Sequence, residues 1–155
     1  MLASRLVLDE DTVRFDSVAF AVRQRGERVE LAGTADSLTV ALHYAPAAGN
    51  DYLLDVTGTI GGLGGRGALL LVGLGSGFAN TDADSQDNYR HYGVSVRRTN
   101  PEVVNFRSLN AGATRAVEGP FDWVAVKSKY FIGVLLSSDS TRPQLGGALV
   151  TGGER

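Results

Sequence analysis

Apolar and polar residues alternate with a period of two along much of this chain. In the clearest run, residues 37–45, the apolar positions are Leu38, Val40, Leu42 and Tyr44. A period of two puts successive side chains on opposite faces of an extended strand, so the run predicts a strand that is buried on one face. A turn-forming stretch at 46–50 and a second alternating run at 51–60 predict an antiparallel hairpin, because so short a loop cannot hold a parallel crossover.

Similar patterns predict further strands elsewhere in the chain. Their ranges are 17–24, 28–32, 68–74, 89–98, 102–109, 122–126 and 130–137. The stretch 68–74 is apolar at successive positions, which predicts a central strand covered on both faces. The glycine-rich residues 61–67 are expected as a flexible connector, and the polar residues 75–88 as a long loop in which 80–88 can hold a helical turn.

The order and length of these elements predict the fold class. Many short strands separated by turns, with few or no helices and no internal repeat, are typical of an all-β antiparallel sandwich. A length of 155 residues suits one domain with a sizeable core, so residues 1–155 are expected to form a single domain.

Composition narrows the classes of function. The net charge of −2 lacks the basic excess of a nucleic-acid binder, so no nucleic-acid partner is expected. The clustered basic residues Arg97, Arg98, Lys127 and Lys129 are interpreted as solvated strand surface. The absence of cysteine excludes disulfides, cysteine-zinc sites and thiol catalysis. No apolar run approaches the ~20 residues that a membrane-crossing helix needs, so we expect the chain itself to be water-soluble and without membrane contact.

Three glycines have the spacing of a dinucleotide-binding loop. They are Gly62, Gly64 and Gly67. That motif needs a helix directly after it, because the N-terminus of the helix binds the pyrophosphate. Residues 68–72 predict a strand instead, so we expect neither a nucleotide site nor another cofactor.

Oxygen-bearing side chains gather in the polar loop. They are Asn80, Asp82, Asp84, Asp87 and Asn88. Loops of this kind can bind calcium, but the EF-hand pattern fails. Counting from Asp82 puts Asp87 rather than glycine at the sixth position and Val94 rather than glutamate at the twelfth. A zinc site needs three or four suitable ligands, which two histidines without cysteine do not supply. We therefore expect a solvated acidic loop and no metal site.

The chain contains residues of two kinds that could act in catalysis. Ser76 lies between glycines, but Leu74 occupies the position where a nucleophile elbow needs glycine. A sugar epimerase could use histidine and carboxylate as acid and base. The candidates for those roles are His43, His91, Glu102 and Glu118. No motif surrounds either histidine, so the histidines are interpreted as exposed or core-edge strand residues, and no catalytic residue is expected.

The segment 119–136 contains the only tryptophan and resembles one known family. The residues that carry the resemblance are Gly119, Trp123, Val124, Ala125, Tyr130 and Phe131. A glycine followed shortly by Trp-Val-Ala, then by Tyr-Phe and an apolar strand, is similar to the large periplasmic domain of the YidC-type membrane protein insertase. The alternating runs between residues 38 and 59 also resemble the central hairpin of this family.

The resemblance implies a twisted antiparallel β-supersandwich, similar to galactose mutarotases. It also implies a location in the periplasm, as a domain of an inner-membrane protein. The implied role is non-catalytic: it supports membrane protein insertion and folding through contacts with Sec translocon accessory subunits or nascent chains. The substrate groove of that family lies in its membrane part, so no site residue carries over. On this resemblance we expect the chain to be an excised and incomplete piece of a larger membrane protein.

The alternative is a stand-alone carbohydrate-binding or aldose-epimerase-like β-sandwich. In that case Trp123, Tyr130 and Phe131 would form a stacking platform for a sugar. We favour core packing for all three, because strand-core residues surround them and large aromatic side chains dominate cores. Trp123 is therefore expected to be largely buried, with Phe121 beside it.

Overall fold

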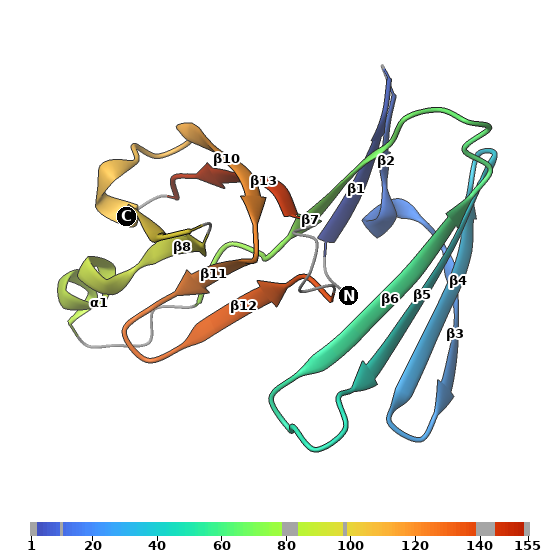
Figure 1. Cartoon of the computed structure of the whole chain (residues 1–155), viewed down its shortest axis with the longest axis horizontal. Helices are drawn as coiled ribbons and strands as arrows, with labels where there is room; N and C mark the ends of the chain where they lie inside the picture. Colours follow the sequence, from blue (N-terminus) through green and yellow to red (C-terminus); the bar gives the residue numbers. More distant parts are fainter. Residues whose placement is uncertain (1–2, 10, 79–83, 98, 139–144, 154–155) are drawn as a thin grey trace. The chain divides into compact units, whose positions relative to one another are not determined.

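The computed structural model describes residues 3–9, 11–78, 84–97, 99–138 and 145–153 (Figure 1). The chain divides into two compact units, Met1–Gly73 (unit 1) and Leu74–Arg155 (unit 2). All strand pairs in the described ranges are antiparallel, and helical segments there are short. The prediction of an all-β antiparallel fold with few helices is confirmed. The organisation of residues 1–155 as one domain stays a prediction.

Unit 1 contains two sheets. The three-stranded sheet has the order β2-β1-β7, with β1 at Ala3–Leu8, β2 at Asp11–Arg14 and β7 at Leu69–Gly73. The four-stranded sheet has the order β3-β4-β5-β6, with β3 at Phe20–Arg25, β4 at Arg28–Ala35, β5 at Leu38–Pro46 and β6 at Leu54–Gly61. The β5–β6 pair is the hairpin that the alternating pattern predicts. Gly26 turns the chain between β3 and β4 with a φ of +62°, a value that glycine adopts without strain.

The core of unit 1 lies between these two sheets. Its buried side chains are Leu6, Leu8, Phe15, Leu38 and Val40. Leu38 and Val40 are 2% exposed and belong to one face of β5, as the period of two requires. Residues on the apolar face of the four-stranded sheet, including Phe20 and Ile60, pack against this cluster.

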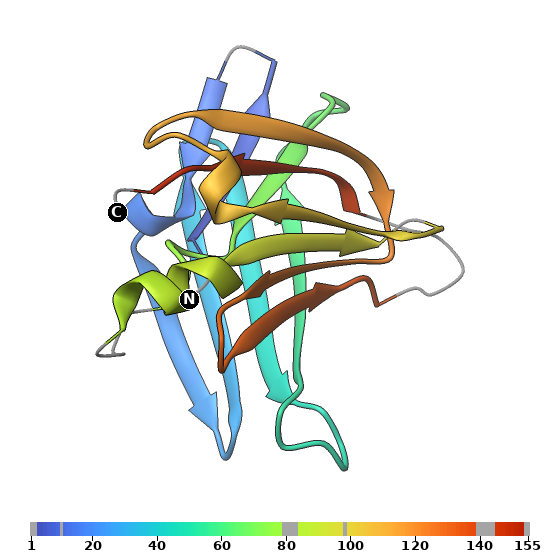
Figure 2. The ribbon, with the colours of Figure 1, turned by 90° about the vertical axis from the view of Figure 1, so that its left-hand side faces the viewer.

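Unit 2 contains a four-stranded sheet and a two-stranded sheet (Figure 2). The four-stranded sheet has the order β12-β11-β8-β9, with β8 at Gly93–Arg97, β9 at Pro101–Asn105, β11 at Trp123–Lys127 and β12 at Ile132–Leu136. The two-stranded sheet pairs β10 (Thr114–Phe121) with β13 (Leu145–Thr151). Helix α1 (Ser85–His91) precedes β8.

The core of unit 2 joins the two sheets. Its buried side chains are Val96, Val104, Leu109, Val117, Phe121 and Val124. Phe121 is fully buried at the end of β10, while Val124 and Val96 face each other across β11 and β8. The face of the four-stranded sheet that carries Val96 and Val124 is therefore its core face.

Each unit contains one short 3-10 turn of similar construction. The turn η1 (Phe15–Ser17) follows β2, and η2 (Phe106–Ser108) follows β9. In η1 the hydroxyl of Ser17 donates to the carbonyl of Arg14 at 2.7 Å, and in η2 the hydroxyl of Ser108 donates to the carbonyl of Asn105 at 2.7 Å. This local bond is a common way for serine to stabilise a turn.

Helix α1 packs on η2 through aromatic rings. The rings of Tyr89 and Phe106 stack with centroids 5.5 Å apart, and Tyr92 lies 6.1 Å from Phe106. The hydroxyl of Tyr92 donates to the carbonyl of Phe78, and burial raises the pKa of Tyr92. These contacts fix the helix that the sequence predicted only as a turn within 80–88.

Several sequence-based boundaries are wrong. The stretch 68–74 was expected to be a central strand, but β7 is an edge strand on which Leu69 is 58% and Leu70 48% exposed. An apolar run alone does not distinguish a covered strand from an edge strand. The predicted strand 89–98 begins as helix α1, and 106–108 is η2 rather than strand, so the β8–β9 hairpin is shorter than expected.

Strands at both ends of the chain and before Trp123 were missed. They are β1, β2, β10 and β13. β10 contains Gly119 and Pro120 next to a shift in register between Glu118 and Phe121, and β13 contains adjacent glycines. Glycine and proline inside a strand are typical of bulges, and they break the alternating pattern by which strands are found in a sequence.

Candidate interaction surface

β12 is the edge strand of the four-stranded sheet in unit 2 (Figure 1). Within the described ranges it pairs with β11 alone. Every second side chain on it is apolar and exposed: Ile132 is 63%, Val134 45% and Leu136 51% exposed. Since successive side chains of a strand alternate between faces, these three lie on the same face of the sheet.

That face continues across β11, β8 and β9. In register, Trp123 lies between Leu136 and Arg97, and Ala125 lies between Val134 and Ser95. Val103 follows opposite Ser95 and is 43% exposed. We call this surface, opposite the core face, the open face of unit 2. It consists of Val103, Trp123, Ile132, Val134 and Leu136. Ala125, at its centre, is fully buried, so its exposed apolar side chains are those of β12 and, separately, Val103.

Trp123 is partly buried and lies on the same face as the exposed side chains of β12, which is consistent with the prediction that it is largely buried. Phe121 does not lie beside it on one strand. β10 ends at Phe121 and β11 begins at Trp123, with a bend at Asp122 between them, and Phe121 packs in the core with Val124. The period of two does not extend through such a bend, which is why it misplaced Phe121.

The turn between β11 and β12 presents two aromatic rings. Tyr130 is 64% and Phe131 61% exposed, so the prediction that both pack in the core is wrong. Ser128 holds the turn: its backbone N–H donates to the carbonyl of Phe131 at 2.8 Å, and its hydroxyl accepts from the N–H of Phe131 at 3.0 Å. Phe131 lies 5.7 Å from the ring of Phe78.

Lys129 connects this turn to helix α1. Its ammonium lies 2.8 Å from a carboxylate oxygen of Asp87 and 5.1 Å from the centre of the Tyr130 ring. The hydrogen bond from Lys129 holds the pKa of Asp87 below its usual value, and the same bond raises the pKa of Lys129. Of the predicted solvated basic residues, Lys129 is thus in an ion pair, Arg97 lies 3.9 Å from Asp122, and Arg98 lies outside the described residues.

The acidic residues of the polar loop form a helix cap and an ion pair rather than a calcium site. Asn80 and Asp82 lie outside the described residues. Asp84 caps helix α1 by accepting from the N–H of Asp87 at 3.0 Å, and Asp87 pairs with Lys129. Asn88 is buried. Among the described residues no cluster of three or more histidine, cysteine or acidic side chains could hold a metal ion.

The acid–base candidates are distributed over both units. His43 is exposed on β5 of unit 1, between Glu30 and Thr57 on the neighbouring strands. His91 is exposed at the end of α1 in unit 2, 4.0 Å from Asp87. Glu102 accepts from Arg115 at 3.2 Å, and Glu118 is exposed on β10. Convergence of the two histidines on one sugar stays a hypothesis.

The glycine-rich stretch leads into β7, as the sequence predicted. No helix follows Gly67, so the element that would bind a pyrophosphate is replaced by a strand. Gly62 has a φ of +85°, and a Cβ atom there would collide with the carbonyl of Ser37. This glycine therefore serves a close backbone approach. Ser76 is exposed in the loop after β7.

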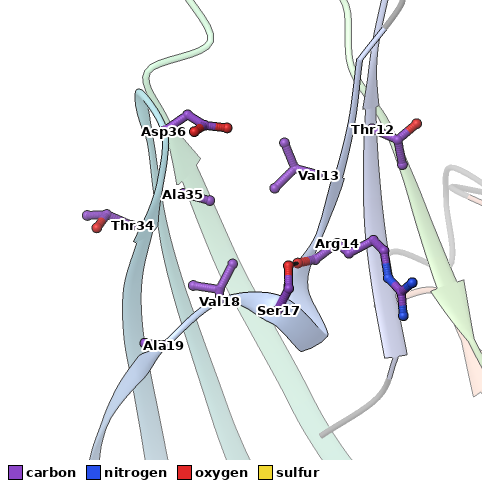
Figure 3. A pocket seen from close by; sticks show the side chains of 9 residues that line it. All are labelled: Thr12, Val13, Arg14, Ser17, Val18, Ala19, Thr34, Ala35 and Asp36. Carbon is purple, nitrogen blue, oxygen red and sulfur yellow. Dashed lines mark hydrogen bonds between the residues drawn. The ribbon is translucent and has the colours of Figure 1, made fainter.

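Unit 1 contains a shallow hollow of about 330 Å³ between β2, η1 and the β4–β5 turn (Figure 3). It is lined by Thr12, Val13, Arg14, Ser17, Val18, Ala19, Thr34, Ala35 and Asp36. Val13 and Val18 project into the hollow, whereas the guanidinium of Arg14 points away from it. None of the lining side chains is an aromatic ring on which a sugar could stack.

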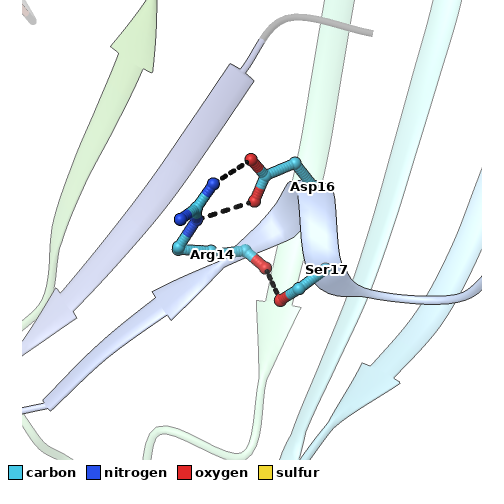
Figure 4. Close-up of polar contacts among 3 residues, drawn as sticks. All are labelled: Arg14, Asp16 and Ser17. Atoms are coloured by element: carbon cyan, nitrogen blue, oxygen red, sulfur yellow. Dashed lines mark hydrogen bonds and ion pairs between the residues drawn. The ribbon is translucent and has the colours of Figure 1, made fainter.

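Arg14 is instead in contact with Asp16 (Figure 4). Two guanidinium nitrogens of Arg14 donate hydrogen bonds to the carboxylate of Asp16, at 3.1 and 2.7 Å. These bonds lower the pKa of Asp16.

A second hollow of about 490 Å³ lies over small residues of β4 and β5, among them Ala32, Thr39 and Ala41. Neither hollow brings several charged groups together.

The open face is the largest departure from the sequence-based interpretation. The missed residues are Val103, Ile132, Val134 and Leu136, which alternation alone assigns to a core. One signal was available: 132–136 contains no charged or polar side chain on either face, yet it is the last strand before a polar stretch. Which face is covered depends on pairing partners that are distant in the sequence.

Comparison with protein-family models, with curated proteins and with solved structures found no match to this chain. Of the helices in the described ranges, none has the length and apolar character needed to cross a membrane.

Proposed function

We propose that this chain is a non-catalytic periplasmic domain of a YidC-type membrane protein insertase, and that it acts by contacting other proteins. The observation that carries the proposal is the open face of unit 2, where Ile132, Val134 and Leu136 are each about half exposed. Exposed apolar side chains gathered on one strand are typical of a protein–protein contact.

One segment supports both the proposed family and the proposed contact with other proteins. Residues 119–136 carry the resemblance to the insertase family, and they also contribute Trp123 and the β12 side chains Ile132, Val134 and Leu136 to the open face. The exposed rings of Tyr130 and Phe131 lie at the turn that leads into β12. Aromatic residues are enriched at protein interfaces because they bury large areas at a small cost in conformational entropy.

The open face is suited to binding an apolar surface of another protein. Charged side chains are confined to its margin, at Arg97 and Lys127. Sec translocon accessory subunits and nascent membrane proteins are the partners proposed on the family resemblance. A nascent membrane segment is strongly apolar, so its binding would be driven by burial of apolar surface.

Site-specific photo-crosslinking tests this function. A photoreactive phenylalanine analogue replaces Leu136 on the open face or, as control, Tyr52 in the β5–β6 loop, which is fully exposed. Each chain is added to inner-membrane vesicles that carry the translocon and a stalled nascent membrane protein. Crosslinks from position 136, and not from position 52, to an accessory subunit or the nascent chain are expected. Equal labelling from both positions, or none, overturns the proposal.

A further inference from the structure

Edge strands of the sheets differ in how they are protected. Most edges in the described ranges carry charge or proline: β2 contains Asp11 and Arg14, β3 contains Arg23 and Arg25, and β9 begins with Pro101 and Glu102. Such residues prevent a strand edge from pairing with another chain. β12, with the sequence Ile-Gly-Val-Leu-Leu, contains neither, as is also true of β7 and β13, and it exposes apolar side chains at every second position.

The backbone of β12 has hydrogen-bonding groups along its open edge. The N–H of Ser137 donates to the carbonyl of Asp122, and Phe131 bonds to Ser128, so odd-numbered residues direct their backbone groups toward β11. The direction alternates along an antiparallel strand. The N–H and C=O groups of Ile132, Val134 and Leu136 therefore point away from β11, toward the open edge.

We propose that β12 pairs with β12 of a second copy of this chain, antiparallel and about a two-fold axis at Val134. In that register Val134 lies opposite Val134 of the copy, and Ile132 lies opposite its Leu136. Every cross-strand pair on the open face is then apolar, the kind of pair that stabilises antiparallel sheets. A two-fold contact uses the same surface on both copies, as closed dimers do.

Side-chain size on the core face fits this pairing. Leu135 of one copy comes opposite Gly133 of the other, on both sides of the axis. The space at Gly133 is open apart from the ring of Phe78, 3.6 Å from the position of a Cβ atom. Glycine therefore leaves room for the leucine that the pairing brings, and the strand is complementary to itself in size as well as in polarity.

The pairing closes after two copies. It uses the β12 edge of each four-stranded sheet and leaves the β9 edge, which Pro101 and Glu102 protect, at both ends. The trapped surface is small compared with the ~1,600 Å² of a standard interface, so a reversible, concentration-dependent dimer is expected. The inference rests on β12 and does not require the proposed function.

Sedimentation equilibrium of the 155-residue chain tests the pairing. The mass is expected to rise with concentration from the monomer value of 16.4 kDa and to level off at twice that value. Val134→Lys places two like charges opposite each other and is expected to weaken association by about tenfold or more. Val134→Glu is expected to do the same, and an equimolar mixture of the two variants is expected to regain the dimer. Val103→Lys, at a site of similar exposure on the β9 side, is the matched control and should dimerise normally.

Disulfide trapping tests the register. Because the chain has no cysteine, Val134→Cys can form only one crosslink, between copies. The two Cα atoms would lie about 5.5 Å apart, a distance that a disulfide spans. Leu136→Cys is the control, since its copies would lie roughly 13 Å apart. A mass that stays at the monomer value, growth beyond two copies, loss of association in Val103→Lys, or faster crosslinking at Leu136 overturns the proposal.

Discussion

The ammonium of Lys129 lies 2.8 Å from the carboxylate of Asp87, and this pair ties the β11–β12 turn to helix α1. Asp87 lies in the first turn of α1, where a negative charge also interacts favourably with the helix dipole. Asp84, three residues before it, caps the same helix. The position of the exposed aromatic turn therefore depends on two carboxylates in a loop that the sequence marked only as acidic.

Lys129→Gln is expected to reduce stability slightly at neutral pH, because both partners are partly solvent-exposed. The pKa of Asp87 is lowered in the folded chain, so its contribution is present above the ordinary aspartate pKa and is lost as the pH falls through the lowered value. The difference in melting temperature between wild type and Lys129→Gln should therefore vanish in strong acid. Lys127→Gln, which removes a nearby charge with no ion pair in the described ranges, should show no such pH dependence. A difference that grows in acid would contradict the pair.

Phe121→Ala is expected to cost about 3–5 kcal/mol of unfolding free energy, the usual range for emptying an aromatic core site. Phe121 is fully buried among valines and a leucine. Trp123→Ala should cost clearly less, because Trp123 is half-buried on the open face. Urea unfolding followed by circular dichroism compares the two variants. A larger loss for Trp123→Ala would mean that the open face is covered.

Gly62→Ala is expected to destabilise the chain more than Gly64→Ala. Both glycines have a positive φ, which costs a residue with a Cβ atom about 1–2 kcal/mol. A Cβ at Gly62 also meets the carbonyl of Ser37, whereas nothing lies within 4 Å of a Cβ at Gly64.

The glycine-rich stretch is expected to bind neither NAD nor ATP in calorimetry. Saturable binding that Gly64→Val abolishes would contradict this reading of the glycine-rich stretch.

Organisation as one domain predicts a single unfolding transition. Phe15→Ala in unit 1 and Phe121→Ala in unit 2 should then shift the same calorimetric peak, with equal calorimetric and van't Hoff enthalpies. Both side chains are buried, so each variant reports on its own core. Two peaks, of which each variant shifts only one, would show that the units unfold independently.

No turnover is expected with common aldoses, esters or nucleotides. The candidate bases His43 and His91 are exposed, and no catalytic motif surrounds either of them. NMR of an aldose incubated with the chain measures epimerisation directly. Epimerisation that disappears in His43→Ala or His91→Ala would favour the alternative of an aldose-epimerase-like sandwich.

The strands that alternate without interruption could be predicted from sequence. The β5–β6 hairpin is an example: Leu38 and Val40 mark a core face, and the short loop forces antiparallel pairing. β10 and β13 could not, because Gly119, Pro120 and the glycines at 146–147 interrupt the pattern. The sequence carries no local signal for which strand bears the register shift.

For the open face, the sequence predicts which side chains share a face but not whether that face is buried. Alternation placed Ile132, Val134 and Leu136 on one face, which is correct, but it assigned that face to the core. Burial of a strand face depends on the element packed against it, and β10–β13 covers the face with Val124 instead. The aromatic pair Tyr130–Phe131 was misassigned for a related reason: Ser128 closes a turn there, so the rings leave the strand.

The two 3-10 turns show that the units share part of their construction. Residues 13–17 and 104–108 both have the sequence Val-x-Phe-x-Ser. In each unit an antiparallel hairpin enters the turn, β1–β2 or β8–β9, and the serine fixes the same bend. A turn of the same sequence pattern therefore occurs in both units. Because each serine bonds to a carbonyl three residues before it, the bend is encoded locally and does not depend on the sheets around it.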